Sequence, residues 1–84
     1  MPPTNDTRTV AMHGIEIEVT HLKDRPGGGA TLDIETDDRR WRVDVTATGD
    51  LDGIVTTWRD GQLATLEDPD WLGELLTRLA GAPA

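Results

Sequence analysis

The chain has 84 residues, which suffices for one small domain and leaves no room for two. Sixteen acidic and eight basic side chains give a net charge of −8, which disfavours direct binding to the phosphate backbone of nucleic acids. Cysteine and serine are absent, so thiolate chemistry and the commonest nucleophiles of covalent catalysis are excluded. We therefore expect a non-catalytic protein with no cofactor, no catalytic residue and no metal site.

The same composition bears on where the protein works. No apolar run approaches the roughly 20 residues of a membrane span, and the first ten residues, MPPTNDTRTV, lack the features of a signal peptide. We expect a cytoplasmic protein with no membrane contact. Residues 1–6 are predicted to be a disordered lead and residues 82–84 a short tail, so residues 7–81 form a single α+β domain.

The first predicted hairpin covers residues 8–20. With a two-residue turn at His13-Gly14, the apolar residues of both strands share one face. Glycine supplies the positive φ that a type I′ turn needs. One long strand bulged at Gly14 is the alternative interpretation. The hairpin register places Glu16 and Glu18 on the face opposite the apolar residues.

The second predicted hairpin, over residues 31–44, has the clearest pattern. A turn at residues 37–38 places Glu35 opposite Arg40 and Asp33 opposite Arg42, and such unlike pairs stabilise a sheet by about 0.2–1 kcal/mol each. The same register gathers the apolar residues on the other face: Leu32, Ile34, Trp41, Val43 and Val45. A slip of one residue would lose both matches.

A third hairpin is predicted over residues 54–66, because Asp-Gly at residues 60–61 between two strand-like segments is a strong turn signal. It sets Trp58 beside Leu63. The connections at residues 23–29 and 46–53 are rich in turn residues. Three hairpins in sequence predict an antiparallel β-meander of about six strands. At least two of the three tryptophans are expected in the core, with a stacking platform for bases or sugars as the alternative.

One C-terminal amphipathic helix should follow the strands. Asp68 is the predicted N-cap, Pro69 suits the first helical position, and Gly81 is the expected stop. The apolar stripe has helical spacing: Leu72, Leu75, Leu76 and Leu79. The predicted fold class is therefore α+β, a meander with this helix packed on the apolar face of the sheet.

Three motifs resemble functional sites only in part. The glycines at residues 27–29 lack the lysine and hydroxyl residue of a phosphate loop, so a hairpin connection is favoured. Residues 50–53 (DLDG) match a fragment of a calcium loop but lack its later glutamate, so a turn is favoured and weak calcium binding is the alternative. His13 and His21 are kept apart by the hairpin register, which argues against a shared metal site.

One surface feature suggests a function. If the second and third strands pair, the outer side of the sheet carries an acidic patch flanked by two arginines, and the candidate partner-binding residues are Glu16, Glu18, Asp33, Glu35, Arg40 and Arg42. A solvated sheet face is the plain interpretation. The alternatives are a docking surface for a basic protein partner or a mimic of a phosphate backbone. We expect a protein-binding or regulatory module; the alternative is a small-molecule or weak metal-binding domain that uses the loop from Thr46 to Gly53.

Overall fold

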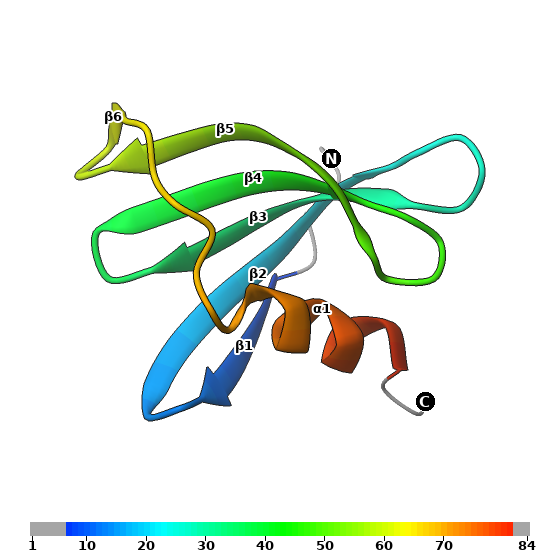
Figure 1. Ribbon diagram of the computed structural model, residues 1–84, viewed down its shortest axis with the longest axis horizontal. Helices are drawn as coiled ribbons and strands as arrows, with labels where there is room; N and C mark the ends of the chain where they lie inside the picture. Colours follow the sequence, from blue (N-terminus) through cyan, green and yellow to red (C-terminus); the bar gives the residue numbers. More distant parts are fainter. Residues whose placement is uncertain (1–6, 82–84) are drawn as a thin grey trace, which may run out of the picture.

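Residues 7–81 are described by the computed structural model, and they form one six-stranded sheet followed by one helix. The strands are β1 (Thr7–Met12), β2 (Ile15–Asp24), β3 (Ala30–Thr36), β4 (Arg39–Val45), β5 (Leu51–Arg59) and β6 (Gln62–Leu63), and the helix is α1 (Leu72–Gly81). Each strand pairs antiparallel with the next, which confirms the α+β meander (Figure 1). The lead expected at residues 1–6 and the tail at 82–84 lie outside the described residues.

The registers of the three hairpins are those predicted from the sequence. The β1–β2 connection shows the physical reason. His13 and Gly14 have φ of 52° and 78°, so both occupy the left-handed region that a two-residue type I′ turn requires. The turn fixes the pairing, and a one-residue slip would carry every apolar side chain to the solvent side. The connection is a hairpin and not a strand bulged at Gly14.

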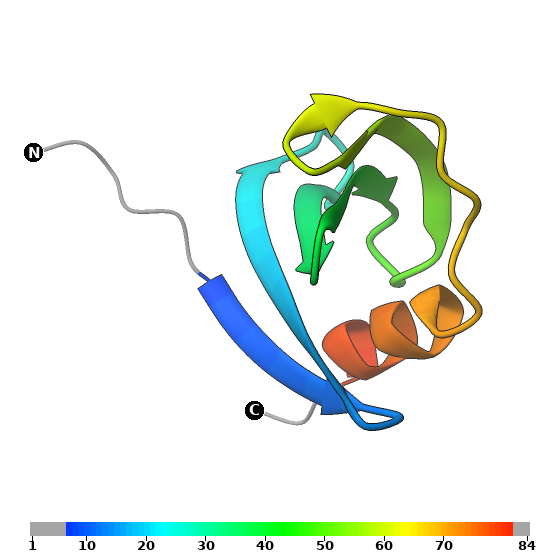
Figure 2. The ribbon, with the colours of Figure 1, turned by 90° about the vertical axis from the view of Figure 1, so that its left-hand side faces the viewer.

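The inner face of the sheet is apolar and is covered by α1. Its buried side chains are Met12, Ile17, Val19, Leu32, Ile34, Trp41, Val43 and Val45. From α1, Leu72, Leu75 and Leu76 are buried against them, whereas Leu79 is only half-buried. The sheet curls, and α1 lies across the open side of the curl (Figure 2). Each buried leucine contributes about 1.5–3 kcal/mol, which is a large share for so small a domain.

The helix begins later than expected. The N–H of Leu72 donates to the carbonyl oxygen of Pro69 at 3.0 Å and closes a tight turn, and only then does the N–H of Leu75 donate to the carbonyl oxygen of Trp71 at 2.9 Å. The first acceptor of α1 therefore belongs to Trp71. The prediction that Asp68 caps the helix is wrong, because Pro69 opens this separate turn and the regular helix starts three residues further on.

Trp41 fastens the linker between β6 and α1 to the core. Its side chain is 1% exposed, and its Nε1–H donates to the carbonyl oxygen of Glu67 at 3.3 Å. The ring of Trp71 packs edge-on against it, with centroids 5.6 Å apart and an interplanar angle of 87°. Two tryptophans, Trp41 and Trp71, thus belong to the core. The number is the expected one, but the sequence pattern favours Trp58 over Trp71. The third, Trp58, lies on the other face of the sheet.

The two ends of the sheet differ in regularity. The β1–β2 register runs without interruption, whereas the β4–β5 register shifts twice, next to Arg42 and next to Asp44. Such bulges bend the strand and disturb its alternation. The β2–β3 loop also comes close to the end of β4, where a Cβ on Gly29 would overlap the backbone oxygen of Val45, so that only glycine fits.

Candidate functional site

The outer face of the sheet, on the side away from α1, presents its side chains in rows that cross the strands. One row crosses all six strands, and its members in strand order are Thr9, Glu18, Glu35, Arg40, Trp58 and Leu63. The next row contains Thr7, Thr20, Asp33, Arg42 and Thr56. Glu16 lies on the same face, opposite Ala11. All six candidate residues therefore share this face, but their surroundings differ.

Asp33 and Arg42 form a two-point ion pair, as predicted. Arg42 donates from Nε to Oδ1 of Asp33 at 2.8 Å and from Nη2 to Oδ2 at 3.1 Å. This hydrogen bonding raises the pKa of Arg42 above its ordinary value, although burial acts in the opposite direction. The side chain of Asp33 is only 13% exposed. The pair thus links β3 to β4, and the largely buried Asp33 contributes little charge to the surface.

Arg40 lies opposite Glu35, but its side chain turns to a different partner. The Cζ atom of Arg40 is 4.1 Å from the ring centroid of Trp58, and that of Arg42 is 5.2 Å from the same ring. Within residues 7–81, Arg40 forms no ion pair with Glu35, and its buried Nε has no hydrogen-bond partner. The predicted pair is therefore right in register and wrong in contact, because the flat guanidinium stacks on the indole ring.

Four acidic side chains line a notch where β2 and β3 separate. Glu18 is directly opposite Glu35, and the β2–β3 ladder ends there. Beyond it, the N-terminal end of β2 and the β3–β4 turn enclose about 500 Å³. This acidic notch consists of Glu16, Glu18, Glu35 and Asp37. In the described part of the chain, none of the four forms an ion pair.

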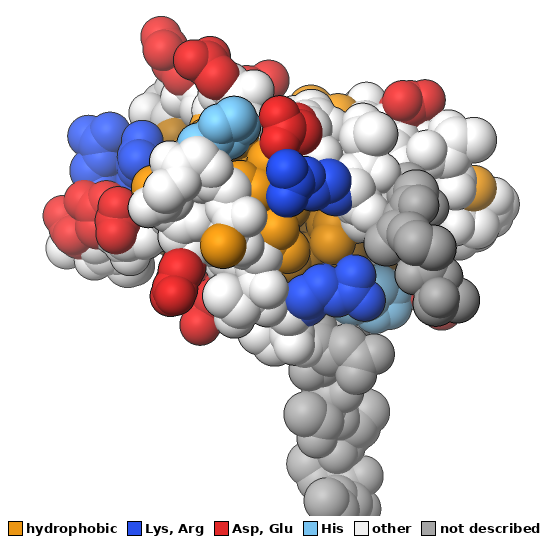
Figure 3. Space-filling view, turned by 90° about the horizontal axis from the view of Figure 1, so that it is seen from below, with side chains coloured by type: hydrophobic (Ala, Val, Ile, Leu, Met, Phe, Trp, Pro, Cys, Tyr) orange, Lys and Arg blue, Asp and Glu red, His pale blue; other side chains and the backbone are white. Residues whose placement is uncertain are grey.

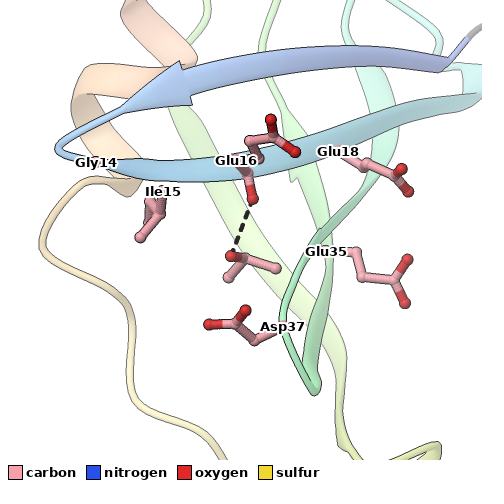
Figure 4. Close-up of a pocket in the computed structure, with 7 residues that line it drawn as sticks. Gly14, Ile15, Glu16, Glu18, Glu35 and Asp37 are labelled. Carbon is pink, nitrogen blue, oxygen red and sulfur yellow. Dashed lines mark hydrogen bonds between the residues drawn. The ribbon is translucent and has the colours of Figure 1, made fainter.

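Figure 4 shows how the acidic notch is held. The hydroxyl of the buried Thr36 donates to the backbone oxygen of Glu16 at 3.1 Å, and this bond ties the two sides together. The carboxylates of Glu18 and Glu35 extend to the same side, whereas that of Asp37 points away from them. The two neighbouring glutamates thus present a doubled negative charge to solvent.

Sequence reasoning missed the aromatic end of the outer face. Trp58 stacks there beneath two arginines, and Leu63 beside it is 75% exposed. The predicted Trp58–Leu63 pairing gave no face assignment, because the two bulges between β4 and β5 break the alternation that would reveal it. Only the pairing of Trp58 with Arg40 of β4 assigns Trp58 to the outer face, and the sequence gives that pairing no local mark.

The segment from Thr46 to Gly53, whose last three residues belong to β5, is held by hydrogen bonds within the chain. The Thr48 hydroxyl donates to Oδ2 of Asp50 at 3.1 Å, and Arg25 holds Asp52 at 2.8 Å. Among residues 7–81, no group of three or more histidine or acidic side chains is placed to hold a metal ion. The carboxylates of this loop have partners within the chain, which gives the acidic notch the stronger claim to an external ligand.

The two histidines lie on separate parts of the surface. Nε2 of His13 is 3.4 Å from Oε1 of Glu74 on α1, and Nε2 of His21 is 2.9 Å from Oδ1 of Asp24. His13 thereby links the β1–β2 turn to the helix. Neither histidine faces the acidic notch, so neither is available to it as a general base.

Comparison of the chain with family models, with curated proteins and with solved structures gave no match. Within residues 7–81, no helix is long and apolar enough to cross a membrane.

Proposed function

We propose that this chain is a small, non-catalytic protein-binding module of the cytoplasm, and that its outer face binds a partner rich in lysine and arginine. The observation that carries the proposal is the direct opposition of Glu18 and Glu35 in the β2–β3 ladder. Like charges placed opposite each other destabilise a sheet. The fold gains nothing from this pair, whereas a cation between the two carboxylates would make the same arrangement favourable.

The rest of the row supports binding to a protein. Trp and Arg are enriched among the residues that dominate binding energy at interfaces, and Trp58 with Arg40 supplies both beside the exposed Leu63. The acidic notch lies on the same face, towards β1. Negative charge there would steer a basic partner and fix its orientation.

The test is affinity capture from the protein's own cell extract, with a variant carrying Glu16→Lys and Glu18→Lys beside the wild type. Both side chains are exposed, so the fold should survive, as circular dichroism will show. A matched control carries Glu67→Lys and Asp68→Lys in the linker before α1, which changes the net charge by the same amount at two exposed positions. We expect the control to retain the partner and the notch variant to lose it.

A salt series sharpens the result. Exposed charges are screened over about 8 Å at physiological ionic strength, so the affinity of the captured partner should fall as salt rises. Salt-independent binding, or equal capture by the two variants, would remove the acidic notch from the account. Capture of nucleic acid in place of protein would contradict the proposed class of partner.

A further inference from the structure

We propose that the free edge of β1 accepts an extended peptide segment in which basic and apolar residues alternate, so that the partner adds a seventh strand to the sheet. This inference rests on the proposed function and names the form in which a basic partner binds. The order of strands places β1 at one edge, and no segment among residues 7–81 pairs with its outer side.

The backbone groups at this edge are defined by the turn. Met12 and Ile15 flank the two-residue turn, so Met12 accepts the hydrogen bond that closes it. Hydrogen-bonded and non-bonded pairs alternate along an antiparallel ladder. The N–H and C=O groups of Thr7, Thr9 and Ala11 therefore point away from β2, where an added strand can replace water as their hydrogen-bond partner.

The edge is regular along its whole length. Proteins often block unwanted pairing at a sheet edge with a bulge or a proline. β1 has neither: its six residues pair with β2 in an unbroken register and contain no proline. At the other end of the sheet, β5 carries two bulges and β6 has only two residues. β1 is thus the better template for strand addition.

Charge determines which residues of the added segment suit its outward positions, meaning those whose side chains lie on the outer face of the sheet. Thr9 and Ala11 have short side chains, and behind them on β2 lie the unpaired carboxylates of Glu18 and Glu16. A residue on the added strand would be two strand spacings, about 10 Å, from these acids. A lysine or arginine and a glutamate can bridge that distance together, across the small side chains of β1. Basic residues therefore suit the outward positions.

The inward positions face an apolar hollow. Seen from below Figure 1, apolar side chains are exposed in the middle of the molecule between basic ones (Figure 3). A cavity of about 280 Å³ is lined by three apolar side chains and two basic ones, Val19, Leu32, Leu79, Arg8 and His21. Val10 of β1 and Leu79 of α1 are only half-buried. Apolar side chains on the inner side of an added strand would extend this surface, while Arg8 would repel basic ones.

The test uses a labelled six-residue peptide of alternating lysine and valine, as long as β1, with capped ends. Its affinity is measured by fluorescence anisotropy for the wild type and for two variants, Thr9→Pro and Thr9→Val. Proline removes the outward N–H without removing a β1–β2 bond, whereas valine keeps that N–H. We expect at least about a tenfold loss with Thr9→Pro, as the loss of one or more hydrogen bonds predicts, and little change with Thr9→Val.

Two further arms keep the result decisive. Two further peptides are N-methylated, one at its lysine amides and the other at its valine amides, and the peptide whose methylated amides face β1 should not bind the unaltered protein, even if Thr9→Pro fails to fold. A peptide with its lysines and valines in two blocks should bind weakly. Equal binding by the two Thr9 variants, or undiminished binding of both N-methylated peptides, would overturn the inference.

The other outcomes separate this inference from the proposed function. If Glu16→Lys with Glu18→Lys weakens peptide binding and Thr9→Pro does not, the acidic notch binds without strand addition, and only the inference fails. If the wild type sediments as a dimer and Thr9→Pro as a monomer, a second copy of the chain occupies the edge, and the assignment to a basic peptide is wrong.

Discussion

On the inner face of the sheet, Ile34 lies opposite Trp41, and both side chains are almost completely buried. On the outer face of the same two strands, Glu35 lies opposite Arg40, and their side chains form no ion pair. The register fixes both pairs equally, yet only the inner one makes the contact that the register suggests. Close packing restricts a buried inner side chain to one conformation, whereas an exposed outer side chain can rotate towards a better partner.

The two faces differ in whether their side chains stabilise the fold. The inner face accounts for most of the burial, and its alternation agrees with the register that the turns fix. The outer face contains one pair that serves the sheet, Asp33 with Arg42, and one that opposes it, Glu18 with Glu35. Groups that a small domain retains at a cost to stability are the first candidates for function.

The largest effect is expected in the core between the inner face of the sheet and α1. Leu75 has no exposed surface, so Leu75→Ala should lower the free energy of unfolding by about 2–5 kcal/mol and unfold much of a marginal domain. Urea unfolding followed by tryptophan fluorescence measures it. The matched variant on the outer face, Leu63→Ala, should change stability by less than about 0.5 kcal/mol. Similar losses at both positions would erase the distinction between the faces.

A smaller loss is expected where the outer face serves the fold. Asp33→Asn removes the charge that Arg42 holds at two points, which should lower stability by about 1–2 kcal/mol. The control is Glu35→Gln, on the same strand and face. Removing that charge should cost nothing. An Asp33→Asn variant as stable as the wild type would place this ion pair among the dispensable surface pairs.

The smallest effect has the opposite sign. Glu18→Gln removes one of two directly opposed charges and should raise the free energy of unfolding by about 0.2–1 kcal/mol at low salt. The gain should shrink as salt rises. Because either substitution relieves the same repulsion, Glu18→Gln and Glu35→Gln together should stabilise little more than either alone. Strict additivity of the two would mean that these glutamates do not interact.

Much of this fold could be predicted from the sequence, because its hairpins have two-residue turns. Such a turn fixes the register, and the alternation of apolar residues then identifies the inner face, as it does for Ile34 and Trp41. The start of α1 could not be predicted. Asp68-Pro69 has the composition of a helix start, but the chain uses it for a separate turn.

The candidate site was predictable only in its backbone positions. The sequence places the acids on one face, but it cannot show that Asp33 is ion-paired while Glu18 and Glu35 are not, because this depends on side-chain conformations. The position of Trp58 escaped prediction for a different reason. Bulges in β5 break the alternation, and no local pattern in the sequence marks them.

If the outer face is built for recognition at some expense to stability, the affinity of Glu18→Gln for the captured partner should reveal it. The measurement is a calorimetric titration at low salt, beside the wild type and the Glu67→Lys, Asp68→Lys control. We predict that Glu18→Gln, although more stable than the wild type, binds its partner several-fold more weakly, because the partner loses one of the two charges it neutralises. If Glu18→Gln is more stable and binds equally well, the opposed glutamates serve neither the fold nor recognition, and the outer face is not built to bind a partner.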